Sequence, residues 1–155
     1  MILAIDPGPE QSAFVLYDDD RRGLDAFGKV PNDEILGLLQ NLRARVLVVE
    51  MIASYGMPVG REVFETCMWI GRFVERWPDE YELLYRAAVK MHLCGTMRAK
   101  DANVRAALMD AWGGKEKAMG TKKQPGPLHG VKGDVWAALG VAVTYADRQE
   151  QARAA

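Results

Sequence analysis

The sequence predicts an α/β fold in which a mixed five-stranded sheet is flanked by helices. Three short apolar segments joined by short polar turns occupy the first 30 residues, which is typical of an antiparallel meander. Two further apolar segments then alternate with stretches of helical periodicity, and a helical crossover places the strands that it joins parallel to one another. A chain of 155 residues can bury a core of its own, so residues 1–155 are expected to form a single domain.

The meander is expected to consist of strands at residues 2–6, 12–18 and 24–30. The first, ILAID, is almost wholly apolar and is followed by PGPEQ, a turn sequence. The second, SAFVLYD, is closed by the polar turn DDDRRG, and the third alternates in the way of a strand with one wetter face.

Helices and strands alternate in the rest of the chain. Asn32 is the expected N-cap of a helix whose apolar stripe is formed by Ile35, Leu38, Leu39 and Leu42. The other expected elements are a buried strand at 45–52, a helix from about 61 to 77, a strand at 81–87, a helix at 100–114 with Asp101 as N-cap, and a last helix at 134–151. The apolar stripe of the second helix is expected at Val63, Phe64, Cys67, Ile70, Val74 and Trp77. Residues 115–133 are expected to be mobile, and the whole order is that of the ribonuclease H-like fold.

Composition is that of a soluble globular protein, with 49% hydrophobic and 26% charged residues. No apolar run approaches the roughly 20 residues that span a membrane, and the N-terminus MILAIDPG does not resemble a signal peptide. Cys67 and Cys94 form no CxxC pair and lie in apolar surroundings, which favours buried free thiols. These observations predict a cytoplasmic protein.

Charge is distributed unevenly along a chain whose net charge is −1. Residues 86–132 contain ten basic and three acidic side chains, which leaves +7 in this segment and −8 in the rest. The asymmetry is typical of a surface that faces a polyanion such as nucleic acid. A solvated helix and loop would explain it equally well.

Three carboxylates stand at the ends of predicted elements. Asp6 ends the first strand, Glu50 lies in the apolar run VLVVEMI near the end of the fourth, and Asp134 begins the last helix. If the first and fourth strands are parallel neighbours, Asp6 and Glu50 lie side by side and require a proton or cations between them. A ring of such carboxylates suits Mg²⁺ or Mn²⁺, and two ions about 3.5–4 Å apart can hydrolyse a phosphodiester.

Each carboxylate also has a structural interpretation. Asp6, before Pro7 and Gly8, could begin a turn, and Asp134 could be an N-cap. Glu50 would need a buried arginine or lysine partner or an exposed strand end, because an unpaired buried charge is costly. The three residues together favour the metal site.

Four segments resemble the RuvC-type Holliday junction resolvases, in particular their small phage or prophage-like branch. The matching segments are LAIDPG, VLVVE, YRAAVKMHLCGTMRAKDANV and DVWAALGVAVTYAD. The resemblance implies a homodimer that cuts branched DNA by metal-dependent hydrolysis and leaves 5′-phosphate ends. It also implies that Asp6, Glu50 and Asp134 bind the metal.

The same resemblance places Lys90 and Lys100 where the family has lysines near the scissile phosphate. It is imperfect at Ala137, where bacterial members commonly carry a further acidic residue three positions after the one matched by Asp134. The site then contains three carboxylates, unless His129 or Asp101 contributes.

Several side chains are candidates for DNA binding. His129 could serve as a general base or metal neighbour, or it could be a surface histidine. Tyr55 could stack on a base exposed at a branch point, or it could be a packing residue. The basic candidates are Arg98, Lys115, Lys117, Lys122, Lys123 and Lys132. Two other functions stay open at this point: another ribonuclease H-like nuclease, acting on RNA–DNA hybrids, forks or flaps, and a branched-DNA binder without activity.

Overall fold

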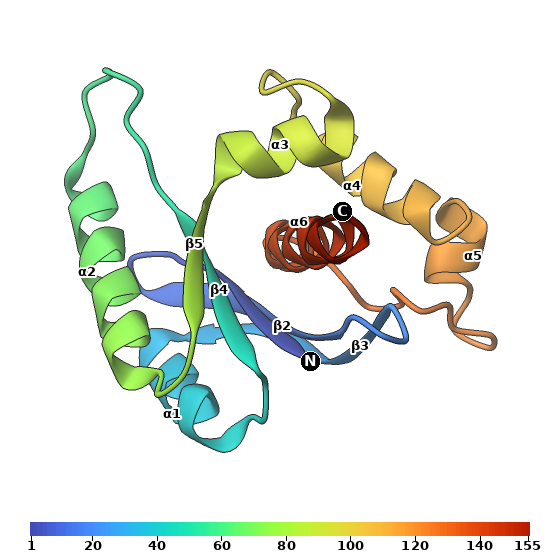
Figure 1. Ribbon diagram of the computed structural model, residues 1–155, viewed down its shortest axis with the longest axis horizontal. Coiled ribbons are helices and arrows are strands. Elements are labelled where there is room, and N and C mark those ends of the chain that lie inside the picture. Colours follow the sequence, from blue (N-terminus) through green and yellow to red (C-terminus); the bar gives the residue numbers. More distant parts are fainter.

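The computed structural model describes residues 1–155 and contains one mixed five-stranded sheet (Figure 1). The strands are β1 (Ile2–Asp6), β2 (Gln11–Asp18), β3 (Gly23–Pro31), β4 (Val46–Met51) and β5 (Tyr81–Tyr85). Their order in the sheet is β3-β2-β1-β4-β5, with β2 antiparallel to β1 and β3, and β4 parallel to β1 and β5. The predicted fold class is confirmed, and the first four strands match their predicted bounds to within one residue.

Helices cover both faces of the sheet. They are α1 (Asn32–Asn41), α2 (Arg61–Arg76), α3 (Arg86–Cys94), α4 (Asp101–Ala111), α5 (Lys115–Met119) and α6 (Val135–Ala154). Figure 1 shows α1 and α2 on one face and α6 on the other, with α3 and α4 beyond α6. No helix combines the length and the apolar character that a membrane crossing requires.

The sheet divides the apolar core in two, and the period of two along each strand decides which side a residue faces. In β1, Leu3 and Ile5 pack toward α1 and α2, whereas Ile2 and Ala4 pack toward α6. Asp6 continues the second series. It therefore lies on the face that α6 covers.

Helix α6 is buried from Val135 to Tyr145, with Ala137 alone partly exposed. Its small residues let the neighbouring helix approach closely, since a Cβ at Gly140 would stand 3.2 Å from a methyl group of Val89 in α3. Burial on all sides anchors the first turns of α6 over the sheet, and this fixes the position of Asp134 at their start.

The predicted strand at 81–87 is wrong at its end, because β5 stops at Tyr85 and Arg86 begins α3. Helix α3 itself was not predicted. It buries only Val89 among its nine residues and ends at Gly95 in the left-handed conformation (φ 71°), so its apolar periodicity is too short to identify it from sequence.

The predicted mobile connection at 115–133 is instead ordered in part. It contains α5 and an isolated bridge between Gly120 and Pro125, and it buries Ala118, Leu128 and Val131 completely or nearly so. These three apolar residues stand singly among lysines and glycines, so the sequence shows no helical or strand period that would predict their burial. Their burial depends on contacts with distant elements.

The predicted stripe of α2 is only partly correct. Ile70 is buried and Trp77, just past the helix, is too, but Phe64 is exposed and Thr66 and Phe73 take buried positions. The predicted cap Asp101 is also wrong, since the N-cap of α4 is Lys100, whose backbone N–H donates to Asn103 Oδ1 at 2.9 Å. Both cysteines are free and partly buried.

Candidate active site

Asp6 and Glu50 lie side by side at the carboxyl ends of two parallel strands. The register of β1 and β4 runs from Ile2 opposite Val46 to Ile5 opposite Val49, and the next step along both strands is Asp6 and Glu50. Neighbouring strands are about 4.8 Å apart, so the two carboxylates belong to one site. The predicted juxtaposition is confirmed.

The same row continues across the sheet to a lysine. Asp6 pairs with Ala13 in β2, and Ala13 pairs with Lys29 in β3. Residues that face each other across strands project on the same side, and Ala13 between them is buried in the core. Lys29 therefore points into the site from the side opposite to Glu50.

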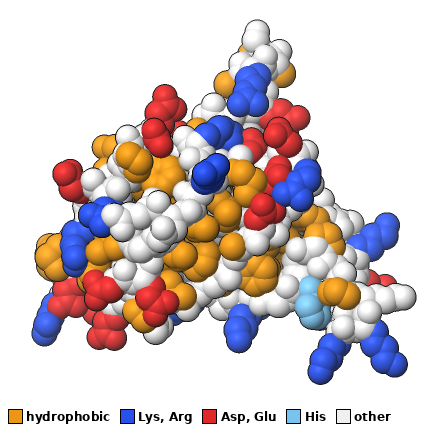
Figure 2. Space-filling model, turned by 90° about the horizontal axis from the view of Figure 1, so that it is seen from below, with side chains coloured by type: hydrophobic (Ala, Val, Ile, Leu, Met, Phe, Trp, Pro, Cys, Tyr) orange, Lys and Arg blue, Asp and Glu red, His pale blue; other side chains and the backbone are white.

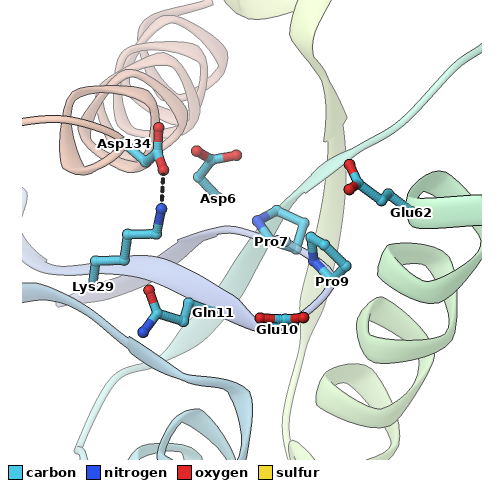
Figure 3. Close-up of a pocket in the computed structure, with 9 residues that line it drawn as sticks. Asp6, Pro7, Pro9, Glu10, Gln11, Lys29, Glu62 and Asp134 are labelled. Carbon is cyan, nitrogen blue, oxygen red and sulfur yellow. Dashed lines mark hydrogen bonds and ion pairs between the residues drawn. The ribbon is translucent and has the colours of Figure 1, made fainter.

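Asp134 joins the site from the start of α6, where it contacts Lys29. Lys29 Nζ donates to Asp134 Oδ2 at 2.6 Å (Figure 3). Asp134 occupies the N-cap position of α6, but its side chain makes no capping hydrogen bond. The structural interpretation of Asp134 as an N-cap is thus not supported by its contacts.

Glu50 has an arginine partner. Arg86, the first residue of α3, donates through Nη1 to Glu50 Oε1 at 2.9 Å and through Nη2 to Asp101 Oδ1 at 2.6 Å. Glu50 is buried, while Arg86 and Asp101 reach the surface. The charge of Glu50 is therefore compensated in part without a metal ion, by an arginine partner of the kind that the structural interpretation of Glu50 requires, although Arg86 itself is not buried.

The electrostatics of the site favour protons or cations on its carboxylates. Burial, reinforced by the charges of Glu50 and Asp134, raises the pKa of Asp6 to about 8, although Arg86 and Lys29 oppose the rise. Burial also raises the pKa of Glu50, against the lowering effect of Arg86. Hydrogen bonding to the same arginine lowers the pKa of Asp101.

A buried polar pair holds the turn that follows Asp6. Ser12 Oγ donates to Asn32 Oδ1 at 2.6 Å and accepts from the Gly8 N–H at 3.2 Å, while Asn32 Nδ2 donates to the Gly8 carbonyl at 2.9 Å. Gly8 has no room for a side chain, because a Cβ would lie 2.4 Å from the Gln11 carbonyl oxygen. The prediction of Asn32 as an N-cap is wrong: it is the first residue of α1, and its amide orders the active-site turn.

An open cleft of about 370 Å³ lies beside these groups (Figure 3). It has no hydrophobic lining residue, and its charged side chains come from five elements or turns: Asp6, Glu10, Lys29, Glu62 and Asp134. A polar cleft of this kind suits a charged ligand better than an apolar one.

The three carboxylates have the chemistry that a hard divalent cation requires, but their side chains are not arranged around a common point. Asp6, Glu50 and Asp134 offer only carboxylate oxygens, which Mg²⁺ and Mn²⁺ prefer. As the side chains stand, no three His, Cys, Asp or Glu residues form a ready metal-binding group. Glu50 Oε1 is turned to Arg86 and Asp134 Oδ2 to Lys29, so an ion would bind the other oxygen of each carboxylate or displace these contacts.

The other predicted residues differ in how close they lie to the carboxylates. Lys90 on α3 is near enough to lower the pKa of both Glu50 and Asp101. Lys100 stands next to Asp101 and is exposed. His129 belongs to no ready metal-binding group, and its Nδ1, 3.0 Å from the Met119 carbonyl oxygen, must donate to it.

The predicted DNA-binding residues are all on the surface. Tyr55 is 68% exposed in the loop between β4 and α2, which Figure 1 shows reaching beyond the sheet. The exposed basic candidates, none of which is in an ion pair, are Arg98, Lys115, Lys117, Lys122, Lys123 and Lys132. Figure 2 shows Lys and Arg side chains projecting singly at the edge of one face.

Four residues of the site were missed from sequence as active-site residues: Lys29, Arg86, Ser12 and Asn32. Lys29 could have been found by extending the hairpin register from Asp6 through Ala13. Arg86 could not, because its position depends on where β5 gives way to α3.

Comparison with solved structures identifies the architecture. Thermus thermophilus RuvC superposes with a TM-score of 0.64 and 17% identity, over 97% of this chain and 96% of that one. The fold is that of RuvC. T. thermophilus RuvC in complex with a Holliday junction substrate superposes with a TM-score of 0.66 and 15% identity, over 97% of this chain and 95% of the other.

No family model matches the sequence, and no curated protein matches it. At 15–17% identity the structural match establishes the fold, and it extends over 97% of this chain. What the site does must therefore be argued from its own residues.

Proposed function

We propose that this protein is a metal-dependent endonuclease that resolves Holliday junctions and other branched DNA by phosphodiester hydrolysis. The observation that carries the proposal is the pairing of Asp6 with Glu50 at one edge of the sheet, in a chain with the RuvC fold. Two carboxylates on neighbouring strand ends, one of them buried, are electrostatically costly, and divalent ions would compensate them.

Asp6, Glu50 and Asp134 would hold the ions, which when bound supply an activated water and stabilise the leaving oxygen. Lys90 and Lys100 would hold oxygens of the scissile phosphate and offset the charge that develops there. The products would carry 5′-phosphates. Arg86 would hold Glu50 through Oε1 from α3 and leave Oε2 for an ion.

Tyr55 would contact the branch point. Its aromatic ring is exposed in a loop beyond the carboxyl end of β4. Its backbone is in the left-handed conformation (φ 50°), which residues other than glycine rarely adopt. Exposed aromatic rings of this kind stack on unpaired bases.

A panel of DNA substrates tests the proposed function. Cleavage of a four-way junction, a Y-fork, a linear duplex and an RNA–DNA hybrid should be compared at equal concentration with Mg²⁺. The proposal predicts cleavage of the junction, with less at the fork and little at the duplex. Cleavage confined to the hybrid would assign the protein to another ribonuclease H-like activity, and tight junction binding without any cleavage would make it a non-catalytic binder.

The basic residues near α5 are expected to contact phosphates. Replacing Lys122 and Lys123 together by alanine should weaken junction binding and reduce the slope of log affinity against log salt by about two, roughly one for each lost contact. Replacement of the exposed Arg43, which lies between α1 and β4, by alanine is the control and should leave the slope unchanged. Equal slopes for all three proteins would mean that the loop is only a solvated surface.

We also propose that the protein is a homodimer formed through α2. Phe64 and Met68 lie one turn apart on this helix and are 66% and 60% exposed, which is unusual for large apolar side chains. Two copies related by a two-fold axis would bury them and present two sites to a junction.

Replacing Phe64 and Met68 by glutamate should convert the dimer to a monomer in sedimentation velocity at micromolar concentration. Met91, exposed on α3, provides the control, because its replacement by glutamate should leave the dimer intact. A wild-type protein that sediments as a monomer under the same conditions would refute the proposed interface.

A further inference from the structure

Lys29 is the one cation that enters the site from the β3 side. It projects from the row that contains Asp6, and its Nζ lies 2.6 Å from Asp134 Oδ2. It also lines two clefts, one with Asp6 and the other with Gly130, Lys132 and Gly133 on the far side of Asp134. From the same backbone position the ammonium can therefore face either the carboxylates or the basic surface near Lys132.

The ion pair between Lys29 and Asp134 is suited to exchange. The two side chains are 44% and 54% exposed, and exposed ion pairs contribute little to stability. Neither partner has another hydrogen bond that would hold it, since Asp134 makes no cap and the Lys29 ammonium makes no second contact. By contrast, Arg86 is held by both Glu50 and Asp101.

We propose that Lys29 is an active-site residue with two alternative partners. It forms an ion pair with Asp134 when no metal is bound, and it contacts a DNA phosphate when Asp134 binds a metal ion. The inference rests on the proposed function, because it assumes that Asp134 is a metal ligand. Its basis is geometric: the ammonium lies 2.6 Å from Asp134 Oδ2, so a divalent cation bound by the same carboxylate would meet a second positive charge at short range. Displaced from Asp134, Lys29 faces the cleft that Lys132 also lines, where a strand passing the site would be met by two lysines.

The metal half of the inference is tested by calorimetric titration of Mn²⁺ into the protein without DNA. Lys29→Met should bind the ion about three- to tenfold more tightly than the wild type, because the competing cation is gone. Lys132→Met is the matched control, since it removes an equal charge from the same cleft without touching Asp134. Equal tightening by both substitutions, or none by Lys29→Met, would overturn the competition.

The DNA half is tested by junction binding in a chelator, where no cleavage occurs. Asp134→Asn frees Lys29 without any metal, so it should bind the junction about three- to tenfold more tightly than the wild type and increase the salt slope by about one. Adding Lys29→Met to Asp134→Asn should abolish this gain. If the gain persists in the double variant, it comes from the loss of a repulsive carboxylate, and the proposed phosphate contact is wrong.

These outcomes are separable from failure of the proposed function. A wild type that nicks no junction with Mg²⁺ contradicts the nuclease assignment, whereas the Mn²⁺ titration reads the competition at Asp134 without DNA or turnover. Thermal unfolding of Lys29→Met should match the wild type in a chelator. A large loss of stability would show that the ion pair is structural and would overturn the proposal.

Discussion

Glu50→Gln is expected to reduce junction cleavage by about a hundredfold to a thousandfold or more, because it removes a ligand charge from the reacting centre. The metal-free protein should be as stable as the wild type or slightly more stable. Burial raises the pKa of Glu50 in spite of Arg86, which means that the ionised carboxylate is less favourable in the folded protein than in water. Cleavage rates with Mg²⁺ and urea unfolding in a chelator measure the two effects.

The matched control is Glu75→Gln, which makes the same chemical change on the exposed surface of α2. It should alter neither cleavage nor stability. If Glu50→Gln instead cleaves normally and loses stability, then the ion pair between Glu50 and Arg86 is a structural salt bridge and not part of a metal site.

The metal-free protein is expected to lose stability as the pH rises from about 4 to about 8. The pKa of Asp6 is near its ordinary value of 3.8 in the unfolded chain and about 8 in the folded protein, so the folded state binds more protons throughout this window. Stability contributed by the protonated carboxyl is present at low pH and lost as the pH rises through the folded pKa. The loss is of the order of a few kcal/mol, since each unit of pKa difference corresponds to about 1.4 kcal/mol.

Urea unfolding in a chelator at several pH values measures this slope. Asp6→Asn should flatten it without abolishing it, because the raised pKa of Glu50 acts in the same direction. Saturating Mg²⁺ should reduce the slope in the wild type, since an ion replaces the proton between the carboxylates. A slope that is unchanged by Asp6→Asn would mean that Asp6 is not the group that titrates.

Strand periodicity predicted correctly that Asp6 and Glu50 lie side by side. The apolar runs around Asp6 and Glu50 identify two buried strands, and the crossover between them makes these strands parallel, so their carboxyl ends meet. The last helix was equally clear from its small and apolar residues, which placed Asp134 at its start. These inferences depend only on the pattern of residues within single strands and helices.

The side chains that support the carboxylates and the neighbouring turn could not be predicted from periodicity. Arg86 contacts Glu50 from the first position of α3, because β5 ends two residues earlier than predicted. Asn32 resembled an ordinary helix cap, yet its amide binds Ser12 and Gly8 from other elements. In each case the role depends on contacts between segments far apart in the chain, which no local pattern records.

The central claim is that Asp6, Glu50 and Asp134 make this RuvC fold a metal-dependent junction nuclease. It is tested most directly by nicking of a four-way junction with and without Mg²⁺, in the wild type and in Asp6→Asn. We expect paired nicks by the wild type with Mg²⁺, none in a chelator, and none by Asp6→Asn under either condition while it still binds the junction. Nicking that survives in the chelator or in Asp6→Asn would contradict the account.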